Sequence, residues 1–225
     1  MLDAGATPFS GGLARAATTT PQEQVFQSVT PAALPDLAGR LIHFTRACPG
    51  PWPGEGLFEY YGALLRGDQG AAHTGFDSLK RILKEKLIRG GSLMTRGRTP
   101  VVSFTSLRPE SLPRLIKWRP SLARWTMAPY GLSLDKQALR RLGALPVVYG
   151  NAETWDRLPA RHRFRFQMEG TGGPVWRSER EWRLPGALDL GLLDPGDMIV
   201  LVPSPAEVRE IETDFGIRAK ALFSS

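Results

Sequence analysis

Two glutamates lie two residues apart late in the chain, in the stretch "WRSEREWRLPG" (residues 176–186). In a strand, alternate side chains share a face, which places Glu179, Glu181 and Arg183 on one side and Trp182 on the other. At a rise of about 3.3 Å per residue, the two glutamates would be about 6.5–7 Å apart at the backbone. Carboxylates this close raise each other's proton affinity unless a cation such as Arg183 compensates. The stretch is therefore either an ion-paired surface strand or a reactive site.

Two further segments share the pattern apolar, apolar, polar, Phe, Thr: "LIHFT" and "VVSFT". Alternation places His43 and Thr45 on one face of the first segment, and Ser103 and Thr105 on one face of the second. If the two strands lie side by side with these faces together, the four polar side chains line one surface. The alternative is a half-exposed sheet whose hydroxyl groups and imidazole face solvent.

The segments around these residues predict the elements that would position them. An apolar stripe at helical spacing predicts a helix over residues 77–89, with Asp77 as its N-cap and a stop at the two glycines that follow. After the apolar strand "MIVLV", Ser204 and Glu207 form a capping-box pattern that predicts another helix. Short strands outnumber helices and do not alternate regularly with them. The sequence therefore predicts an α+β fold with a mixed or antiparallel sheet and a few flanking helices.

The chain has 225 residues, of which 42% are hydrophobic, as is typical of one folded domain. Residues 1–36 lack helical or strand periodicity and are predicted to form a disordered leader, so that residues 37–225 make a single α+β domain. No apolar run could cross a bilayer and no secretory signal pattern is present, so we expect a cytoplasmic protein that does not contact the membrane. One cysteine, Cys48, and three scattered histidines predict no metal site.

A formal net charge of +7 favours contact with polyanions. In "RHRFRF" strict alternation predicts a strand with Arg161, Arg163 and Arg165 on one face and Phe164 and Phe166 on the other. The arginines could follow the phosphates of a nucleic acid while the phenylalanines stack on its bases. The alternative is an amphipathic strand with its phenylalanines in the core and its arginines in solvent.

The order of these motifs resembles the AbiGi family of abortive-infection phage-resistance proteins, whose members have been labelled antitoxins. The shared segments are "HFT", "LKRILKEKLIRGG", "PVVSFTSL", "YGLSL", "PVVYG" and "SEREWRL", spread over about residues 39–202. The chain departs from the family at Ser106 and Leu107, where an acidic residue near an apolar pair is expected. The resemblance implies a phage-defence protein with a cognate toxin or antitoxin as its partner.

More distantly, the same succession resembles the ADP-ribosyltransferase fold. In those enzymes a His or Arg on an early strand, a Ser or Thr on a second strand and a late Glu surround NAD. The resemblance implies NAD as a substrate and three catalytic residues: His43 at the nicotinamide-side ribose, Glu181 at the ribose hydroxyl and Glu179 at the acceptor. The substrate-binding residues that it implies are Thr45, Ser103, Thr105, Tyr130 and Arg183.

The chemistry of that reaction agrees with these residue types. Breaking the nicotinamide glycosidic bond builds positive charge on the ribose, and a fixed carboxylate stabilises that charge. Nicotinamide leaves as a neutral molecule, so no strong general acid is needed. The chain has no glycine-rich dinucleotide fingerprint, which argues against a Rossmann mode of NAD binding.

Two functions follow from the sequence. One is an enzyme that transfers ADP-ribose from NAD to a protein or nucleic acid, or hydrolyses NAD. The other is a non-catalytic antitoxin or regulatory protein that binds a partner protein or a nucleic acid.

Overall fold

The computed structural model describes residues 37–93, 95–108, 111–112, 116, 118–119, 124–125, 127–169 and 177–223. The predicted leader, residues 1–36, lies outside the described residues. Seven strands form the central sheet: β1 (Arg40–Phe44), β3 (Val101–Thr105), β6 (Gly131–Asp135), β7 (Leu145–Pro146), β10 (Glu181–Pro185), β12 (Met198–Val202) and β13 (Ala219–Ala221). The helices around it are α2 (Leu57–Arg66), α3 (Gly75–Glu85), α4 (Lys136–Arg141), α5 (Ala152–Arg157) and α6 (Pro205–Phe215).

The sheet is mixed, with the strand order β13-β12-β6-β1-β3-β10-β7. Only β12 and β13 are parallel neighbours, and the other adjacent strands pair antiparallel. The predicted α+β class with a mixed sheet is confirmed. Three small two-stranded sheets accompany it: β2 (Leu87–Ile88) with β11 (Leu188–Asp189), β4 (Trp118–Arg119) with β5 (Arg124–Trp125), and β8 (Val148–Gly150) with β9 (Phe166–Met168).

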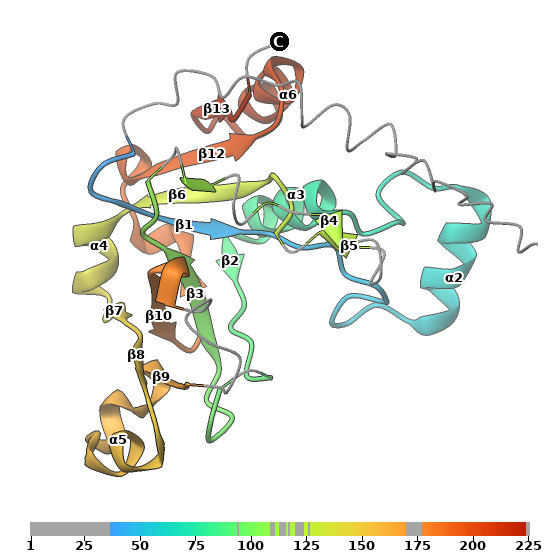
Figure 1. Ribbon diagram of the computed structural model, residues 1–225. Coiled ribbons are helices and arrows are strands. Elements are labelled where there is room, and N and C mark those ends of the chain that lie inside the picture. The colour runs from blue at the N-terminus through green and yellow to red at the C-terminus, as the bar shows by residue number, and fades with distance from the viewer. Residues whose placement is uncertain are drawn as a thin grey trace, which may run out of the picture.

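The central sheet opens between β1 and β3. The register of β1 with β6 runs along the whole of β1, and that of β3 with β10 along the whole of β3. Between β1 and β3, by contrast, only Ile42 and Thr105 lie opposite each other. Figure 1 shows the consequence: β12, β6 and β1 run across the molecule, whereas β3 and β10 turn away from them toward α5.

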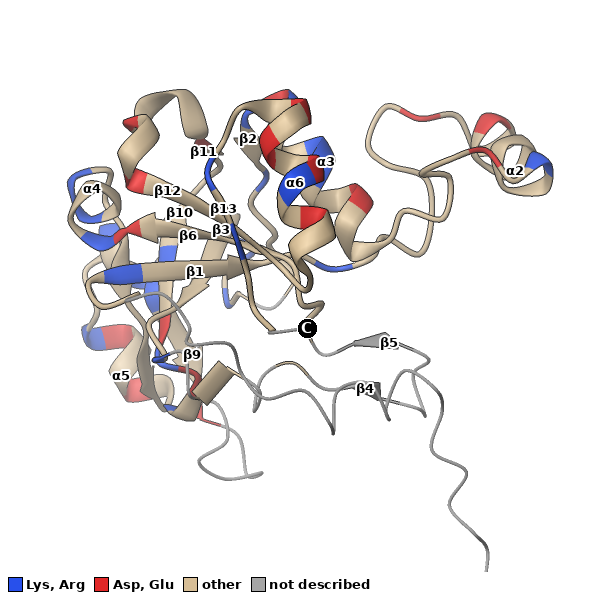
Figure 2. Cartoon of the chain, turned by 90° about the horizontal axis from the view of Figure 1, so that it is seen from above, with Lys and Arg blue, Asp and Glu red and all other residues tan. Residues whose placement is uncertain are grey.

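Each face of the sheet carries its own core. On one face Leu41, Leu132 and Val200 pack with Leu79 of α3 and Ile211 of α6, all fully buried. The opposite face has a smaller cluster that includes Ile42, Phe44, Ile199, Leu201 and Leu222. Figure 2 shows α3 and α6 together on the first face, where blue and red segments adjoin and Lys80 pairs with Glu210 at 3.2 Å.

The helix predicted over residues 77–89 is shorter and begins earlier. Thr74 is the N-cap of α3, and Asp77 completes a capping box from the third helical position. The helix ends at Glu85 because Lys86 adopts a left-handed conformation (φ 52°), after which β2 pairs with β11. The predicted capping box of Ser204 and Glu207 at the start of α6 is confirmed. The sequence did not predict α2, which has Gly56 at its N-cap and no capping side chain.

The alternating segment "RHRFRF" is not a strand. Residues Ala160–Arg165 form the 3-10 helix η3, and Phe166 begins β9. Phe164 and Phe166 are both buried, but each belongs to a different element. Alternation of buried and exposed residues therefore arises here without the period of a strand. Arg161 is exposed, whereas Arg163 is half-buried and donates its Nε–H to the Leu158 carbonyl at 3.2 Å.

A close backbone approach next to β2 gives a test of the fold. A methyl group at Gly90 would overlap the Gly186 carbonyl, whereas one at Gly91 would meet nothing within 4 Å. Gly90→Ala should therefore lower the free energy of unfolding by about 1–3 kcal/mol through overpacking. Gly91→Ala, the matched control, should change it by less than about 0.5 kcal/mol. Urea denaturation measures both changes in stability through the shift of the midpoint, provided that the m-value is unchanged. Equal midpoints for the two variants would contradict this packing.

Candidate active site

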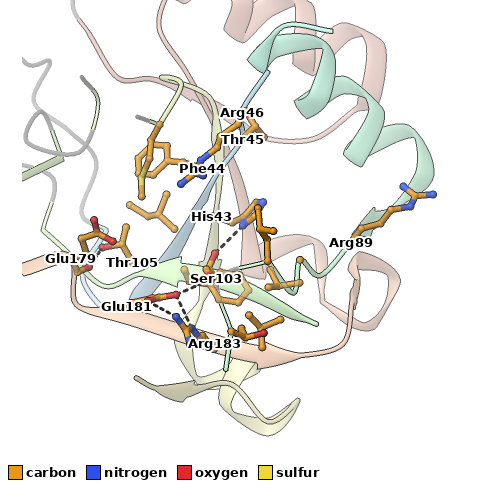
Figure 3. A pocket seen from close by; sticks show the side chains of 18 of the residues that line it. His43, Phe44, Thr45, Arg46, Arg89, Ser103, Thr105, Glu179, Glu181 and Arg183 are labelled. Carbon is orange, nitrogen blue, oxygen red and sulfur yellow. Dashed lines mark hydrogen bonds and ion pairs between the residues drawn. The ribbon is translucent and has the colours of Figure 1, made fainter. Parts of the chain in front are cut away.

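A pocket of about 490 Å³ lies where β1 and β3 diverge (Figure 3). Side chains of β1, β3 and β10 line it, together with residues of α3 and of the loop after β2. It includes every predicted catalytic and substrate-binding residue except Tyr130. The polar lining residues on the described part of the chain are His43, Thr45, Arg46, Ser78, Arg89, Thr95, Ser103, Thr105, Gln167, Glu179, Glu181 and Arg183.

The carboxylate of Glu181 is held from two sides. Its Oε1 accepts hydrogen bonds from Ser103 Oγ at 2.8 Å and from Arg183 Nε at 2.9 Å, and its Oε2 accepts one from Arg183 Nη2 at 3.2 Å. The strand register explains this arrangement, because Glu181 lies opposite Thr105 and Arg183 opposite Ser103, so that all four share one face. The Glu181 side chain is only 12% exposed, so its orientation toward the pocket is fixed.

Arg183 is a buried cation whose donors are used within the protein. Besides Glu181, it donates to the Phe166 carbonyl at 2.8 Å and to Gln167 Oε1 at 2.6 Å. Its side chain is 3% exposed. The sequence placed Arg183 correctly as a compensating cation beside the carboxylates. Its geometry is that of a residue that positions Glu181, because few of its N–H groups remain for a substrate.

The sequence predicted that Glu179 and Glu181 lie on one strand, but Glu179 lies outside β10. It ends the 3-10 helix η4 (Arg177–Glu179), and Arg180 then adopts a left-handed backbone conformation with φ 47° before β10 begins. The end of β3 holds this kink: Thr105 Oγ1 donates to the Glu179 carbonyl at 2.6 Å, and Ser106 Oγ donates to the Arg180 carbonyl at 3.1 Å. A strained conformation of this kind persists only where its surroundings enforce it.

The electrostatics of Glu179 agree with two carboxylates in one pocket. Burial raises the pKa of Glu179, the charge of Glu181 raises it further, and Arg46 partly lowers it. The raised pKa makes Glu179 a better proton acceptor than an ordinary surface glutamate.

The predicted row of four polar side chains on one face is wrong. Because Ile42 lies opposite Thr105, both Ser103 and Thr105 share the face of Ile42, and His43 projects to the other face. There the His43 ring meets Phe104 edge-on, at 5.9 Å between ring centroids. His43 nevertheless lines the same pocket as Glu181, because the sheet is open beside it.

Ser103 connects His43 with Glu181. Its carbonyl lies 2.9 Å from His43 Nδ1, while its hydroxyl donates to Glu181. A carbonyl can only accept, so Nδ1 carries the proton in this contact. Burial lowers the pKa of His43 and keeps the ring neutral. In that tautomer Nε2 is an acceptor.

The remaining predicted residues have supporting positions. Thr45 Oγ1 donates to the Gly75 carbonyl at 2.7 Å, which ties the end of β1 to the start of α3. Tyr130 lies outside the pocket: its hydroxyl donates to Glu207 Oε1 at 2.8 Å and its ring stacks on Phe76. Burial, followed by the Glu207 contact, raises the pKa of Tyr130. A substrate-binding role for Tyr130 therefore has no support in this geometry.

Sequence reasoning missed several residues of the site. Arg46 lines the pocket and makes no ion pair with any described residue, whereas Arg89 pairs with Glu85. Tyr149 lies close enough to the carboxylates that, after burial itself, Glu181 and Glu179 raise its pKa. Arg46 directly follows the "HFT" motif, which is the one signal that could have marked it. Arg89 reaches the pocket wall, and Tyr149 comes near the two carboxylates, through turns that no spacing in the sequence reveals.

A smaller cavity of about 170 Å³ adjoins this pocket and shares His43, Ser78, Ile82 and Arg89 with it. No group of three or more His, Cys, Asp or Glu side chains within the described ranges could hold a metal ion. No helix in the part of the chain that the structure describes is long and apolar enough to cross a membrane.

No family model, curated protein or solved structure matches the chain. The resemblances drawn from the motifs therefore stay predictions. A proposal for the function therefore depends on the chemistry of the pocket.

Removal of the buried cation should be costly. Arg183→Ala leaves the largely buried Glu181 carboxylate without its ion pair, and such a loss costs about 3–5 kcal/mol. The matched control is Arg157→Ala, because Arg157 pairs with Glu153 at the surface with 77% of its side chain exposed. That change should cost less than about 0.5 kcal/mol. Thermal and urea unfolding measure both, and a loss below 1 kcal/mol for Arg183→Ala would contradict the clamp.

The raised pKa of Glu179 predicts a pH-dependent stability difference. The folded protein binds this proton more tightly than the unfolded chain does, so stability falls as pH rises from the usual carboxyl pKa of about 4.3 through the raised value. Glu179→Gln removes this loss. The variant should be more stable than the parent at neutral pH by roughly 0.5 kcal/mol, a small value because solvent screens a half-exposed group. Urea unfolding should show the difference disappear below pH about 4, and a constant difference across pH would exclude this cause.

Proposed function

We propose that the protein cleaves the nicotinamide glycosidic bond of NAD in the pocket between β1 and β3 and transfers the ADP-ribose to an acceptor or to water. The observation that carries the proposal is the bridge made by Ser103, which joins a neutral histidine on one strand to a fixed carboxylate on another. His, Ser and Glu on three strands around one pocket are the set that the ADP-ribosyltransferase resemblance implies.

Glu181 would stabilise the charge that develops as the bond breaks. When the bond to nicotinamide lengthens, positive charge spreads over the ribose C1″ and ring oxygen, and nicotinamide departs with the bonding electron pair as a neutral molecule. Among the described residues, Oε2 of Glu181 accepts one hydrogen bond, from Arg183 at 3.2 Å, which leaves it able to accept another from a ribose hydroxyl. Because Ser103 and Arg183 already fix the carboxylate, little reorganisation is needed during the reaction.

His43 and the arginines of the pocket supply the binding groups. The neutral His43 ring can accept a hydrogen bond from a ribose hydroxyl at Nε2, since Nδ1 is engaged by the Ser103 carbonyl. Arg46 lines the pocket and has no ion pair among the described residues. It is suited to the pyrophosphate of NAD, because one guanidinium group can donate two parallel hydrogen bonds to phosphate oxygens. A pocket of about 490 Å³ falls within the usual size of small-molecule sites.

Glu179 would act on the nucleophile. Its raised pKa suits a general base that takes a proton from the acceptor, or from water, as the new bond to C1″ forms. The resemblance to the AbiGi proteins supports a role for this reaction in phage defence, in the cytoplasm where NAD is present.

The second candidate is a non-catalytic antitoxin or regulatory protein that binds a partner or a nucleic acid. One observation favours it: Arg183 engages both oxygens of Glu181, as in ion pairs that only stabilise a scaffold. A cleavage assay separates the two candidates.

Glu181→Gln keeps the shape of the side chain and its contact with Ser103 but removes the charge. We expect nicotinamide release from NAD to fall at least about 100-fold, the usual effect of losing one electrostatic stabiliser of a transition state. Glu153→Gln, at an exposed glutamate of α5, is the matched control and should release nicotinamide at the parent rate. Chromatography of released nicotinamide measures all three proteins. Equal rates for the parent and Glu181→Gln, or no release by the parent, would refute the proposal.

A further inference from the structure

A group of arginines lies beside the pocket and takes no part in the reaction proposed above. The loop that follows β2 lines the pocket with Leu93 and Thr95 and then carries Arg96 and Arg98, both exposed. Thr95 is buried, and its hydroxyl holds the loop through the carbonyls of Ser92 (3.0 Å) and Thr99 (2.8 Å). The backbone that carries the two arginines is therefore held in place next to the pocket.

These arginines continue onto α5 and η3 through Trp155. The guanidinium carbon of Arg96 lies 4.9 Å from the centroid of the Trp155 ring, and that of Arg163 lies 5.1 Å from it. Stacking on an indole restricts a guanidinium and keeps its N–H groups in one plane. Arg161, two residues earlier in η3, is exposed and donates its Nε–H to His162 Nε2 at 3.2 Å. We call Arg96, Arg98, Arg161 and Arg163 the arginine ridge.

The ridge is a surplus of positive charge. None of its four arginines makes an ion pair with a carboxylate among the described residues, where seven other lysines and arginines do. The nearby carboxylates Glu153 and Glu169 are already paired with Arg157 and Arg177. Asp156 is the remaining carboxylate of α5. Guanidinium groups without a carboxylate partner, two of them held on the Trp155 ring, suit the phosphate diesters of a polynucleotide.

The ridge also connects directly with the catalytic carboxylate. Arg183, which holds Glu181, donates to the carbonyls of Phe164 at 3.5 Å and of Phe166 at 2.8 Å, at the end of η3. Arg163 precedes Phe164 in the same 3-10 helix. A strand lying on the ridge would therefore have an end or an unpaired base within reach of the pocket.

We propose that the acceptor of the ADP-ribose is a single-stranded polynucleotide held by the arginine ridge; this inference rests on the proposed function. A nucleotide amine or hydroxyl attacks C1″ of the ribose, its nitrogen or oxygen forms the new bond, and the bond to nicotinamide breaks with its electron pair on the nicotinamide nitrogen. The proton of the nucleophile passes to the Glu179 carboxylate. Because the ridge contacts phosphates, and Trp155 is already covered by arginines, binding is independent of sequence.

The test uses the full chain with NAD labelled in its adenylate part and with three acceptor arms: single-stranded RNA, single-stranded DNA and a denatured protein mixture. Nicotinamide release is measured in every arm, so that cleavage and transfer are read separately. The ridge variant is Arg96→Gln/Arg98→Gln. The matched control is Arg140→Gln/Arg141→Gln on α4, which carries blue segments in Figure 2, lies apart from the pocket lining and has two exposed arginines.

Label on RNA, DNA or both supports the proposal, and the arm that is labelled identifies the sugar that is accepted. The ridge variant should lower the fraction of cleaved NAD that ends on the polynucleotide at least tenfold, and the control should match the parent. In binding assays with a fluorescent oligonucleotide, loss of two phosphate contacts should reduce the slope of log K against log salt by about 1.4.

Three results overturn the inference in different ways. Nicotinamide release with label only on protein or in free ADP-ribose excludes a polynucleotide acceptor and leaves the cleavage reaction standing. No nicotinamide release by the parent in any arm removes the proposed function and the acceptor together. Equal transfer by the ridge variant and the parent excludes the ridge as the binding surface.

Discussion

Only Ile42 and Thr105 face each other between β1 and β3, and beyond this pair the two strands diverge. In a continuous sheet the Ser103 carbonyl would pair with a backbone N–H of the neighbouring strand, and no side chain could enter between them. Here the carbonyl accepts a hydrogen bond from His43 instead. The imidazole thus satisfies a backbone group that the opening would otherwise leave unpaired, and the pocket exists because the sheet is interrupted at this point.

A pocket in a sheet requires charged groups where a core would normally lie, and this imposes a second constraint. Arg183 is 3% exposed, so its charge must be compensated by neighbours. Glu181, Gln167 and the carbonyls of Phe164 and Phe166 provide the compensation. Because those partners come from β10 and from the η3–β9 segment, the same contacts that stabilise the cation also attach that segment to the sheet. Orientation of the carboxylate and stability of the fold depend on one guanidinium.

Prediction from sequence succeeded where local physics decides the structure. Capping chemistry located α6, and strand alternation correctly paired Glu181 with Arg183 on one face. It failed where tertiary contacts override the local pattern. The register of β1 against β3 decides which face His43 shares, and nothing within either segment encodes that register. Arg46 was marked only by its place directly after "HFT", and its entry into the pocket depends on where the chain leaves β1.

The failure at Glu179 is instructive because a single residue causes it. Arg180 adopts a conformation that costs a non-glycine residue about 1–2 kcal/mol, so extended geometry was the reasonable expectation for the Glu-Arg-Glu segment. The hydroxyl groups of Thr105 and Ser106, at the end of β3, offset this cost by donating hydrogen bonds to the carbonyls of Glu179 and Arg180. The kink gives the two carboxylates different environments, Glu181 bound by a cation and a hydroxyl, Glu179 partly buried with a raised pKa. Identical residues two positions apart are thereby suited to the two tasks proposed for them, stabilisation of a cation and removal of a proton, because the backbone between them is bent.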